Sequence, residues 1–475
     1  MPLPTIPSGN VNSGLATGYN VANSLRFNDG SSEYLHFTPS SAGNRRTMTL
    51  SVWFKGTSLA DGTNNILGQY NSSNENNSML LTIESNGRIM VWNYTTSAYT
   101  MNLRTNRLLL DPSAWYHVVV AVDTTQSTDT DRVKIYVNGV QETSFFASTY
   151  PTQNLELFMN ENKAQNIGTQ RYGSTVGSPF DGYMAEFCFI DGQQLAPTSF
   201  GEFDSDSPTI WKPIDVSGLT FGTNGYYLDF EDSSALGNDV SGNNNDFTPV
   251  NFASTDQSID TCTNNFSTFN SLFVYTTIKP SYSDGNLTAI FDNSGNNEHA
   301  PSTIAVANGK WYGEFKWVSA TGTGATVTGV FPVDADISSD LNAQSHCYLG
   351  DGQKRILNTS SSYGNSYTSG DIIGIALDMD NNKLYFSKNG TWQDSGDPTS
   401  GSTGTGAISI TADKTYFMYC SDYASSGNRS ADANFGSPET SVSSGNADAN
   451  GYGNFEYSVP SGYYALCTKN LAEFG

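Results

Sequence analysis

The sequence predicts an all-β protein built of two antiparallel β-sandwich domains. Apolar residues recur with a period of two along many short segments, and no apolar stripe of helical spacing runs for any length. Turns rich in Asn, Gly and Ser separate these segments, as expected for antiparallel strands. Aromatic residues make up 12% of the 475-residue chain, which gives two or three domains enough apolar area to bury.

The first set of predicted strands precedes residue 200. Residues 116–122 are apolar on both faces, which is typical of a fully buried strand. Val133, Ile135 and Val137 alternate with polar residues and lead into Asn138-Gly139, a dipeptide that favours a tight hairpin. The same pattern predicts strands at 48–54, 79–83, 89–94, 155–159 and 183–190.

A second set of predicted strands begins near Trp311, and it comprises 311–317, 371–378, 383–390 and 415–420. Between the two sets, residues 201–300 contain 14 acidic residues against only Lys212 and Lys279, so this fifth of the chain carries −12 of the net charge of −24. We interpret it as an acidic connecting segment with a few strands, and cation binding is the alternative.

The charge balance excludes several classes of partner. Only 14% of residues are charged, with 22 Lys and Arg against 46 Asp and Glu. A chain so poor in cations repels phosphate and anionic lipid, so we expect neither nucleic-acid binding nor membrane insertion. The first residues have neither the basic nor the apolar region of a signal peptide, and we therefore expect no export by that route.

The cysteines are odd in number and far apart, without a Cys-x-x-Cys pair or a neighbouring histidine of metal-site spacing. This spacing predicts small buried side chains or free thiols rather than a disulfide framework or a zinc site. The five positions are Cys188, Cys262, Cys347, Cys420 and Cys467.

Two domain families are recognisable in these strands. Residues 20–203 resemble a laminin-G-like, concanavalin A-type lectin domain, most specifically through Phe180-Asp-Gly-Tyr-Met-Ala-Glu-Phe187. Residues 305–467 resemble a SPRY domain through Gly309-Lys-Trp-Tyr-Gly-Glu-Phe315 and Gly370-Asp-Ile-Ile-Gly-Ile-Ala-Leu-Asp378. Both families have two-sheet antiparallel sandwiches. We expect an N-terminal attachment arm at 1–23, the lectin-like sandwich at 24–203, the acidic connecting segment at 204–304 and the SPRY-like sandwich at 305–475.

The order of these parts is similar to that of virion proteins of tailed bacteriophages. Ser24-Leu-Arg-Phe-Asn28, Ala42-Gly-Asn-Arg-Arg-Thr47 and the stretch 239–252 stand in that order before the SPRY-like end. The resemblance implies a fibre, spike or surface decoration, assembled in the host cytoplasm and exposed on the particle. Residues 1–24 would contact other virion proteins, and the sandwiches would bind a host-surface glycan or protein. A homo-oligomer is compatible with this role. A soluble lectin-type module is an alternative.

Catalysis is not expected. Concanavalin-type glucanases carry a Glu-x-Asp-x-(x)-Glu pattern on one strand, and the nearest match, Asp229-Phe-Glu231-Asp232, has the wrong order. Alternation would still place Asp229 and Glu231 on one strand face, so a polysaccharide-degrading hydrolase is the alternative. His117 lies within a predicted buried strand, where a hydrogen-bonded core histidine is expected rather than a base.

Calcium is the best candidate for a metal ligand. The stretch Asp239-Val-Ser-Gly-Asn-Asn-Asn-Asp246 offers oxygens from Asp239, Asn243, Asn245 and Asp246, the donors that a hard cation prefers. It lacks the spacing of an EF-hand, and a turn-rich hairpin loop accounts for the same residues. We favour the loop.

Sugar binding requires an exposed aromatic platform with polar neighbours. If Ile89 and Val91 face the core, Trp92 and Tyr94 point outward; in the opposite register they are core residues, and the two are almost equally favoured. The candidate glycan-binding residues are Trp92, Tyr94, Tyr99, Tyr70 and Tyr172.

Overall fold

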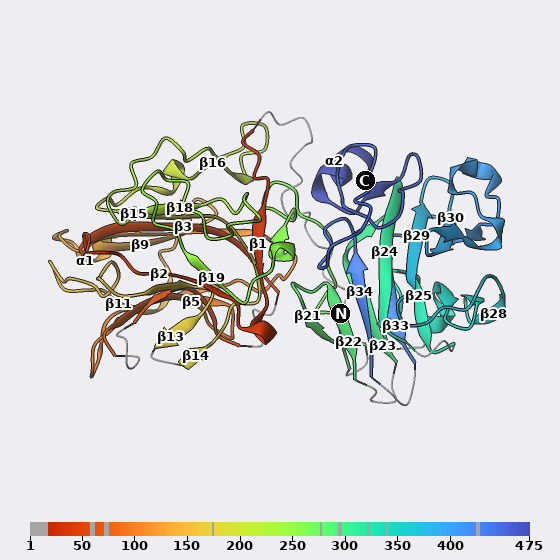
Figure 1. Ribbon diagram of the computed structural model, residues 1–475, viewed down its shortest axis with the longest axis horizontal. Coiled ribbons are helices and arrows are strands. Elements are labelled where there is room, and N and C mark those ends of the chain that lie inside the picture. Colours follow the sequence, from red (N-terminus) through yellow and green to blue (C-terminus); the bar gives the residue numbers. More distant parts are fainter. Residues whose placement is uncertain are drawn as a thin grey trace. The chain divides into compact units, whose positions relative to one another are not determined.

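The computed structural model describes residues 18–475 except 58–61, 71–75, 173–174, 276–277, 293–296, 321–323, 339–340 and 424–427. Contacts divide the chain into a first unit, which ends at Thr263, and a second unit, which begins at Asn264. Each unit is a two-layered β-sandwich (Figure 1). The predicted all-β class with two antiparallel sandwiches is therefore confirmed. Residues 1–17 of the predicted arm lie outside the described residues.

The two layers of the first unit are formed by two long antiparallel sheets (Figure 1). The first sheet runs in the order β10 (Val140–Gln141), β9 (Val133–Val137), β8 (Tyr116–Asp123), β3 (Thr47–Gly56), β15 (Gly182–Asp191), β1 (Ser24–Phe27) and β20 (Gln257–Ser258), with β18 (Tyr226–Leu228) also paired to β15. The second runs β11 (Phe145–Thr149), β7 (Tyr99–Leu108), β6 (Arg88–Tyr94), β5 (Ser78–Ile83), β4 (Asn64–Gln69), β12 (Gln165–Ile167), β2 (Tyr34–Phe37) and β19 (Thr248–Val250). Two hairpins, β13 (Gln170–Tyr172) with β14 (Thr175–Gly177) and β16 (Gly201–Phe203) with β17 (Trp211–Pro213), and the short helix α1 (Asp129–Arg132) complete the unit.

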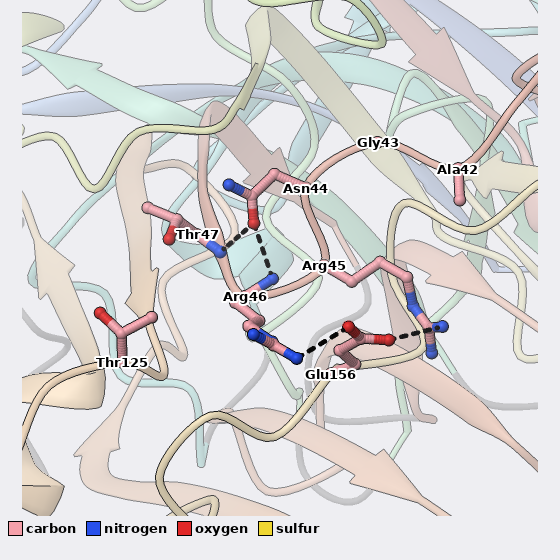
Figure 2. A pocket seen from close by; sticks show the side chains of 8 residues that line it. All are labelled: Ala42, Gly43, Asn44, Arg45, Arg46, Thr47, Thr125 and Glu156. Carbon is pink, nitrogen blue, oxygen red and sulfur yellow. Dashed lines mark hydrogen bonds and ion pairs between the residues drawn. The ribbon is translucent and has the colours of Figure 1, made fainter.

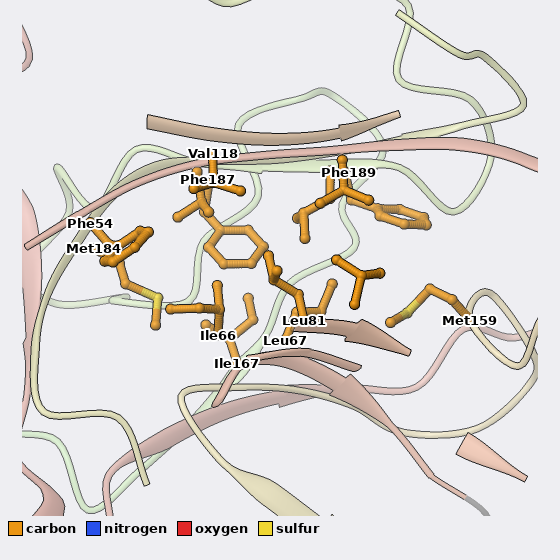
Figure 3. Packing of buried hydrophobic residues seen from close by; sticks show 14 of the residues in the cluster. Phe54, Ile66, Leu67, Leu81, Val118, Met159, Ile167, Met184, Phe187 and Phe189 are labelled. Atoms are coloured by element: carbon orange, nitrogen blue, oxygen red, sulfur yellow. The ribbon is translucent and has the colours of Figure 1, made fainter. Parts of the chain in front are cut away.

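The core of the first unit lies between these sheets, where side chains from both layers interdigitate (Figure 3). Strand β8 is buried on both faces, as its sequence predicts. Val118 and Val120 point into the core, whereas Val119 belongs to a second apolar cluster with Phe221 and Tyr227 on the outer side of the first sheet. The Asn138-Gly139 turn has positive φ at both residues (48° and 78°), which is the backbone that the dipeptide was expected to supply.

One predicted strand, 155–159, is a loop instead. Leu157 and Met159 are buried in the core, which explains the apolar alternation. The backbone of this stretch finds irregular partners, because the amide of Leu157 donates to the carbonyl of Arg45 and the amide of Phe158 donates to the side chain of Asn93. Alternating burial therefore arose here without a ladder of strand hydrogen bonds.

The second unit also pairs two antiparallel sheets. One consists of β21 (Ser281–Ser283), β22 (Thr288–Phe291), β34 (Arg429–Asn434), β24 (Lys310–Ser319), β29 (Ile372–Asp378), β30 (Lys383–Lys388) and β31 (Thr391–Trp392), with β32 (Ile408–Ser409) also paired to β30 and β35 (Tyr464–Ala465) also paired to β24. The other consists of β23 (Glu298–Val306), β33 (Tyr416–Asp422), β25 (Thr326–Pro332), β26 (His346–Leu349), β27 (Gln353–Ile356) and β28 (Thr359–Ser362). Helix α2 (Thr468–Phe474) ends the chain, and no helix in the described parts is long and apolar enough to cross a membrane.

The acidic stretch 204–304 is divided between the two sandwiches. Strands β18, β19 and β20 extend both sheets of the first unit, and β21, β22 and most of β23 belong to the second. The division falls between Thr263 and Asn264. The net charge of the stretch did not reveal this division between the two units, because its short strands are interrupted by Asp-rich turns. All five cysteines are buried free thiols, as expected.

Candidate functional site

The outer face of β6 carries two aromatic side chains of the candidate glycan site. Ile89 and Val91 are fully buried in the core, and this register turns Trp92 and Tyr94 outward, where both are partly exposed. Asn93 faces inward and accepts the amide proton of Phe158 at 2.7 Å. The structure thus selects one of the two registers that the sequence left open.

Trp92, Tyr94 and Tyr99 form one cluster, which we call the aromatic platform. Tyr94 and Tyr99 are cross-strand partners on β6 and β7. The ring of Trp92 is nearly perpendicular to both, at centroid distances of 6.2 Å from Tyr94 and 5.7 Å from Tyr99. Tyr99 is 44% exposed. Edge-to-face contacts hold the rings in place, so the platform is ordered before any ligand arrives.

Polar side chains adjoin the aromatic platform on the same face. Asn102 on β7 is the cross-strand partner of Trp92, and Arg104 is the partner of Met90. The Arg104 guanidinium donates to Asn102 Oδ1 at 3.3 Å and forms an ion pair with Glu84 at 3.2 Å. An exposed aromatic surface beside an amide, a guanidinium and a carboxylate is the combination that sugar rings and their hydroxyls require.

Tyr70 and Tyr172, the other two candidate residues, contact each other. Tyr70 is only 3% exposed, and its ring lies 5.8 Å from that of Tyr172, a partly exposed residue of β13. Tyr70 also packs against Gly68, where an added Cβ would lie 2.9 Å from the Tyr70 ring. Tyr70 is thus packed into the surface of the sheet, and little of its side chain is exposed to a ligand.

The predicted calcium residues form a loop whose polar groups bind one another. Both carboxylate oxygens of Asp239 accept backbone protons. Oδ1 accepts the amide protons of Tyr227 and Ser241, each at 2.9 Å, and Oδ2 accepts that of Asn245 at 2.8 Å. Asn243 and Asn245 donate through their amide nitrogens to backbone carbonyls, among them that of Gly225. Asp246 accepts the amide proton of Asp239. Within the described residues, no three His, Cys, Asp or Glu side chains form a group that could hold a metal ion. These contacts describe a loop that is closed by its own hydrogen bonds.

Asp229 and Glu231 do not lie together on one face of a strand. Strand β18 ends at Leu228, and Phe230 has a φ of 59°, which breaks the alternation that the pairing needed. Instead, Asp229 accepts the backbone amide proton of Glu231 at 3.1 Å. The expectation of one shared face therefore fails because the chain turns at Phe230, two residues after the strand ends.

His117 is a buried, hydrogen-bonded histidine. The indole of Trp211 donates to its Nδ1 at 2.9 Å, so the ring proton of the neutral imidazole resides on Nε2, which lies 2.8 Å from the Ser51 hydroxyl. Burial lowers the pKa of His117 to about 3. Because Nε2 carries the proton, it donates to Ser51 and is not available as a base toward it.

A buried carboxyl group that sequence reasoning missed lies on the first sheet. Glu186 is 5% exposed, sits at a bulge between β15 and β3, and has a φ of 50°, which is uncommon for Glu. Tyr227 donates to it at 2.8 Å, and the hydroxyl of Tyr19 lies 3.0 Å from that of Tyr227. Burial raises the pKa of Glu186 to about 8. Its place in the most family-specific motif was the only sequence signal.

An open polar pocket of about 530 Å³ lies at one end of the first sandwich (Figure 2). The segment 42–47 lines it, with Thr125 and Glu156 opposite. Asn44 Oδ1 accepts the amide protons of Arg46 and Thr47, and the Glu156 carboxylate bridges Arg45 at 3.4 Å and Arg46 at 3.0 Å. Arg45 also pairs with Glu161 at 2.7 Å. Two guanidinium groups are thus neutralised by two carboxylates, and the pocket offers no net positive charge.

Comparisons with known proteins match two segments of the chain. Residues 29–193 match the model of the concanavalin A-like lectin/glucanases superfamily of laminin G type, and residues 310–436 match the SPRY domain. A search of curated proteins finds no match.

Solved structures resemble parts of the chain. The SPRY domain of human HERC1 is 19% identical and covers 31% of this chain and 87% of its own, with a TM-score of 0.25. The heptameric SAP-like pentraxin of Limulus polyphemus is 15% identical and covers 38% and 80%, with a TM-score of 0.29. The CBM40 of the Ruminococcus gnavus IT-sialidase, bound to sialyllactose, is 16% identical and covers 32% and 84%, with a TM-score of 0.24. From the two family matches, the chain carries a laminin G-like domain of the concanavalin A-like lectin class followed by a SPRY domain.

Proposed function

We propose that this chain is an adhesive binding protein whose lectin-like sandwich binds a glycan at the aromatic platform. The observation that carries the proposal is the ordered group of Trp92, Tyr94 and Tyr99 on an outer sheet face, beside Asn102 and the Arg104–Glu84 pair. The lectin-class match of the same domain supports it. Apolar ring faces would stack on the aromatic side chains, and the adjoining polar groups would bind hydroxyls.

Binding measurements on matched variants test this role. Trp92→Ala and Tyr99→Ala in the full chain should each weaken glycan binding by about tenfold, in line with the loss of an aromatic contact at a binding site. Phe203→Ala is the control, because Phe203 is exposed to a similar extent (43%) and lies outside the platform. Loss of binding in the control, or unchanged binding in both platform variants, would contradict the assignment.

The proposed setting is a tailed-bacteriophage particle, on which the protein would be a fibre, spike or surface decoration. The order of the sequence segments supports this, and residues 1–24 would attach the chain to other virion proteins. Mass spectrometry of purified particles, with cross-linking from residues 1–24, tests the setting. A chain found only free in the lysate would exclude it.

The proposal assigns binding and no hydrolysis to the lectin-like sandwich. The Asp229 carboxylate accepts the backbone amide proton of Glu231, and the turn at Phe230 keeps the two side chains from sharing a strand face, which supports this assignment. Release of reducing ends from host-envelope glycan by the purified protein, lost in Asp229→Asn, would overturn it and favour a hydrolase.

A further inference from the structure

The outer face of β6 and β7 changes from aromatic to cationic along the strands. Tyr94 pairs with Tyr99, Trp92 with Asn102, Met90 with Arg104 and Arg88 with Leu108. From Tyr94 to Arg88 the strand advances six residues, or about 20 Å. A ligand that contacts both ends must therefore be extended, like several linked sugar units, and a single ring is too small.

The two arginines of this face are held in fixed positions. Arg104 is bound through Asn102 and Glu84 and remains 27% exposed. Arg88 donates to the Thr105 carbonyl at 2.6 Å, and its guanidinium lies 4.6 Å from the ring centre of Phe146. Phe146 on the neighbouring strand β11 is 63% exposed, so a second aromatic surface lies at the cationic end.

The local charge is opposite to that of the chain as a whole. Arg88, Arg104 and Arg107 lie here against Glu84 and Glu142, which are each already paired with one of these arginines. This leaves a surplus of one positive charge in a chain of net charge −24. The pocket at 42–47 lacks such a surplus. Because the Debye length is about 8 Å at physiological salt, a ligand on this face responds mainly to the nearby arginines.

We propose that this stripe, defined as Arg88, Trp92, Tyr94, Tyr99 and Arg104, binds an extended acidic polysaccharide whose uronic or sialic carboxylates contact the two arginines. A planar guanidinium matches a carboxylate through two parallel hydrogen bonds, and the Asn102 amide adjoins the arginines as a partner for hydroxyls. The inference rests on the proposed glycan-binding function and adds the charge and the length of the ligand.

The test uses a panel of purified acidic bacterial polysaccharides and the full-length protein. Each polysaccharide is presented with its carboxylates intact and after chemical reduction of these groups to alcohols, so that backbone and linkage are the same. We expect about tenfold tighter binding of the intact form, falling as salt is raised, since hydrogen bonds to charged groups are the strong ones.

Two variants and a control locate the preference. Arg88→Gln, which removes the surplus positive charge, should reduce the preference for the intact form to near unity while binding of the reduced form persists, whereas Trp92→Ala should weaken both. Lys163→Gln makes the same charge change at an exposed loop residue outside the stripe and should leave the preference unchanged. Equal binding of intact and reduced polymers by the wild type overturns this inference alone. Absence of binding to any intact or reduced polymer overturns the glycan-binding proposal as well.

Discussion

Lys55 Nζ lies 2.7 Å from Asp260 Oδ2, with neither side chain more than 1% exposed. The pair joins β3 to the segment that follows β20, the last strand of the first unit. Asp260 also accepts the indole proton of Trp115 at 3.1 Å, and the ammonium group lies 5.4 Å from the Tyr183 ring centre. Two charges removed from water thus hold the end of the first unit against its sheet.

Breaking this buried ion pair should lower the free energy of unfolding far more than breaking an ion pair at the surface. Asp260→Asn or Lys55→Met leaves a buried charge without its partner and should lower the free energy of unfolding by about 3–5 kcal/mol. The double variant should recover much of the loss. Urea denaturation measures both. Lys134→Met, which breaks the exposed pair with Asp131, should cost under about 1 kcal/mol. Equal effects at the two sites would show that Asp260 does not act through its charge.

Acid should destabilise the first sandwich through His117. Burial lowers the folded-state pKa of His117 to about 3, below the ordinary 6.5, so the unfolded chain binds a proton that the folded chain rejects. Stability is therefore lost as pH falls below 6.5 toward 3. Relative to the wild type, His117→Gln should gain about 2–3 kcal/mol between pH 7 and about pH 4.5, as measured by denaturant titration at each pH. A constant difference would contradict burial of a neutral imidazole.

Glu186 should act in the opposite pH range. Burial raises its folded-state pKa to about 8 from the ordinary 4.5, so between these pH values the folded chain keeps a proton that the unfolded chain releases. Stability is therefore lost as pH rises from 4.5 to 8. Glu186→Gln keeps a neutral acceptor for Tyr227, and its stability advantage should grow by about 4 kcal/mol from pH 5 to pH 9. Glu202→Gln, at an exposed carboxylate, should show no such growth and serves as the control.

The Asp239 loop should be indifferent to calcium. Its carboxylate oxygens already accept backbone protons, and its asparagine side chains present nitrogens rather than oxygens to the neighbouring carbonyls. Excess calcium or a chelator should leave the melting temperature unchanged, whereas Asp239→Ala should cost about 2–4 kcal/mol by leaving buried amides without an acceptor. A fall in melting temperature on chelation, absent in Asp239→Ala, would favour a metal site instead.

The fold class could be predicted from the sequence because periodicity two is a local property. Strand β9 follows it directly, and the Asn138-Gly139 turn follows from backbone chemistry. The loop at 155–159 shows the limit, since alternating burial does not require a hydrogen-bonded neighbour. The division of the acidic stretch depended on long-range pairing, such as β20 with β1 and β19 with β2, which local composition does not encode.

The aromatic platform could be predicted in part. Spacing placed Trp92 and Tyr94 on one face, but only the burial of Ile89 and Val91 settled which face meets the core. Arg104 and Glu84 were missed because Arg104 lies on β7 and Glu84 directly follows β5, so that only the pairing of the strands brings them together. Glu186 was missed because its strained backbone and its proton affinity arise from the bulge rather than from its neighbours in sequence.

The chain enters and leaves the first sandwich at one place. The amide of Val21 donates to Thr263 Oγ1 at 3.1 Å, and the Thr263 hydroxyl donates to the Val21 carbonyl at 3.2 Å. Nearby, Ser24 of β1 is the cross-strand partner of Ser258 of β20. A mechanical load between the two ends of this unit would first be borne by these few bonds. The core and the outer face of β6 and β7 would remain unstretched until β1 separated from β20, so the site could keep its shape under tension.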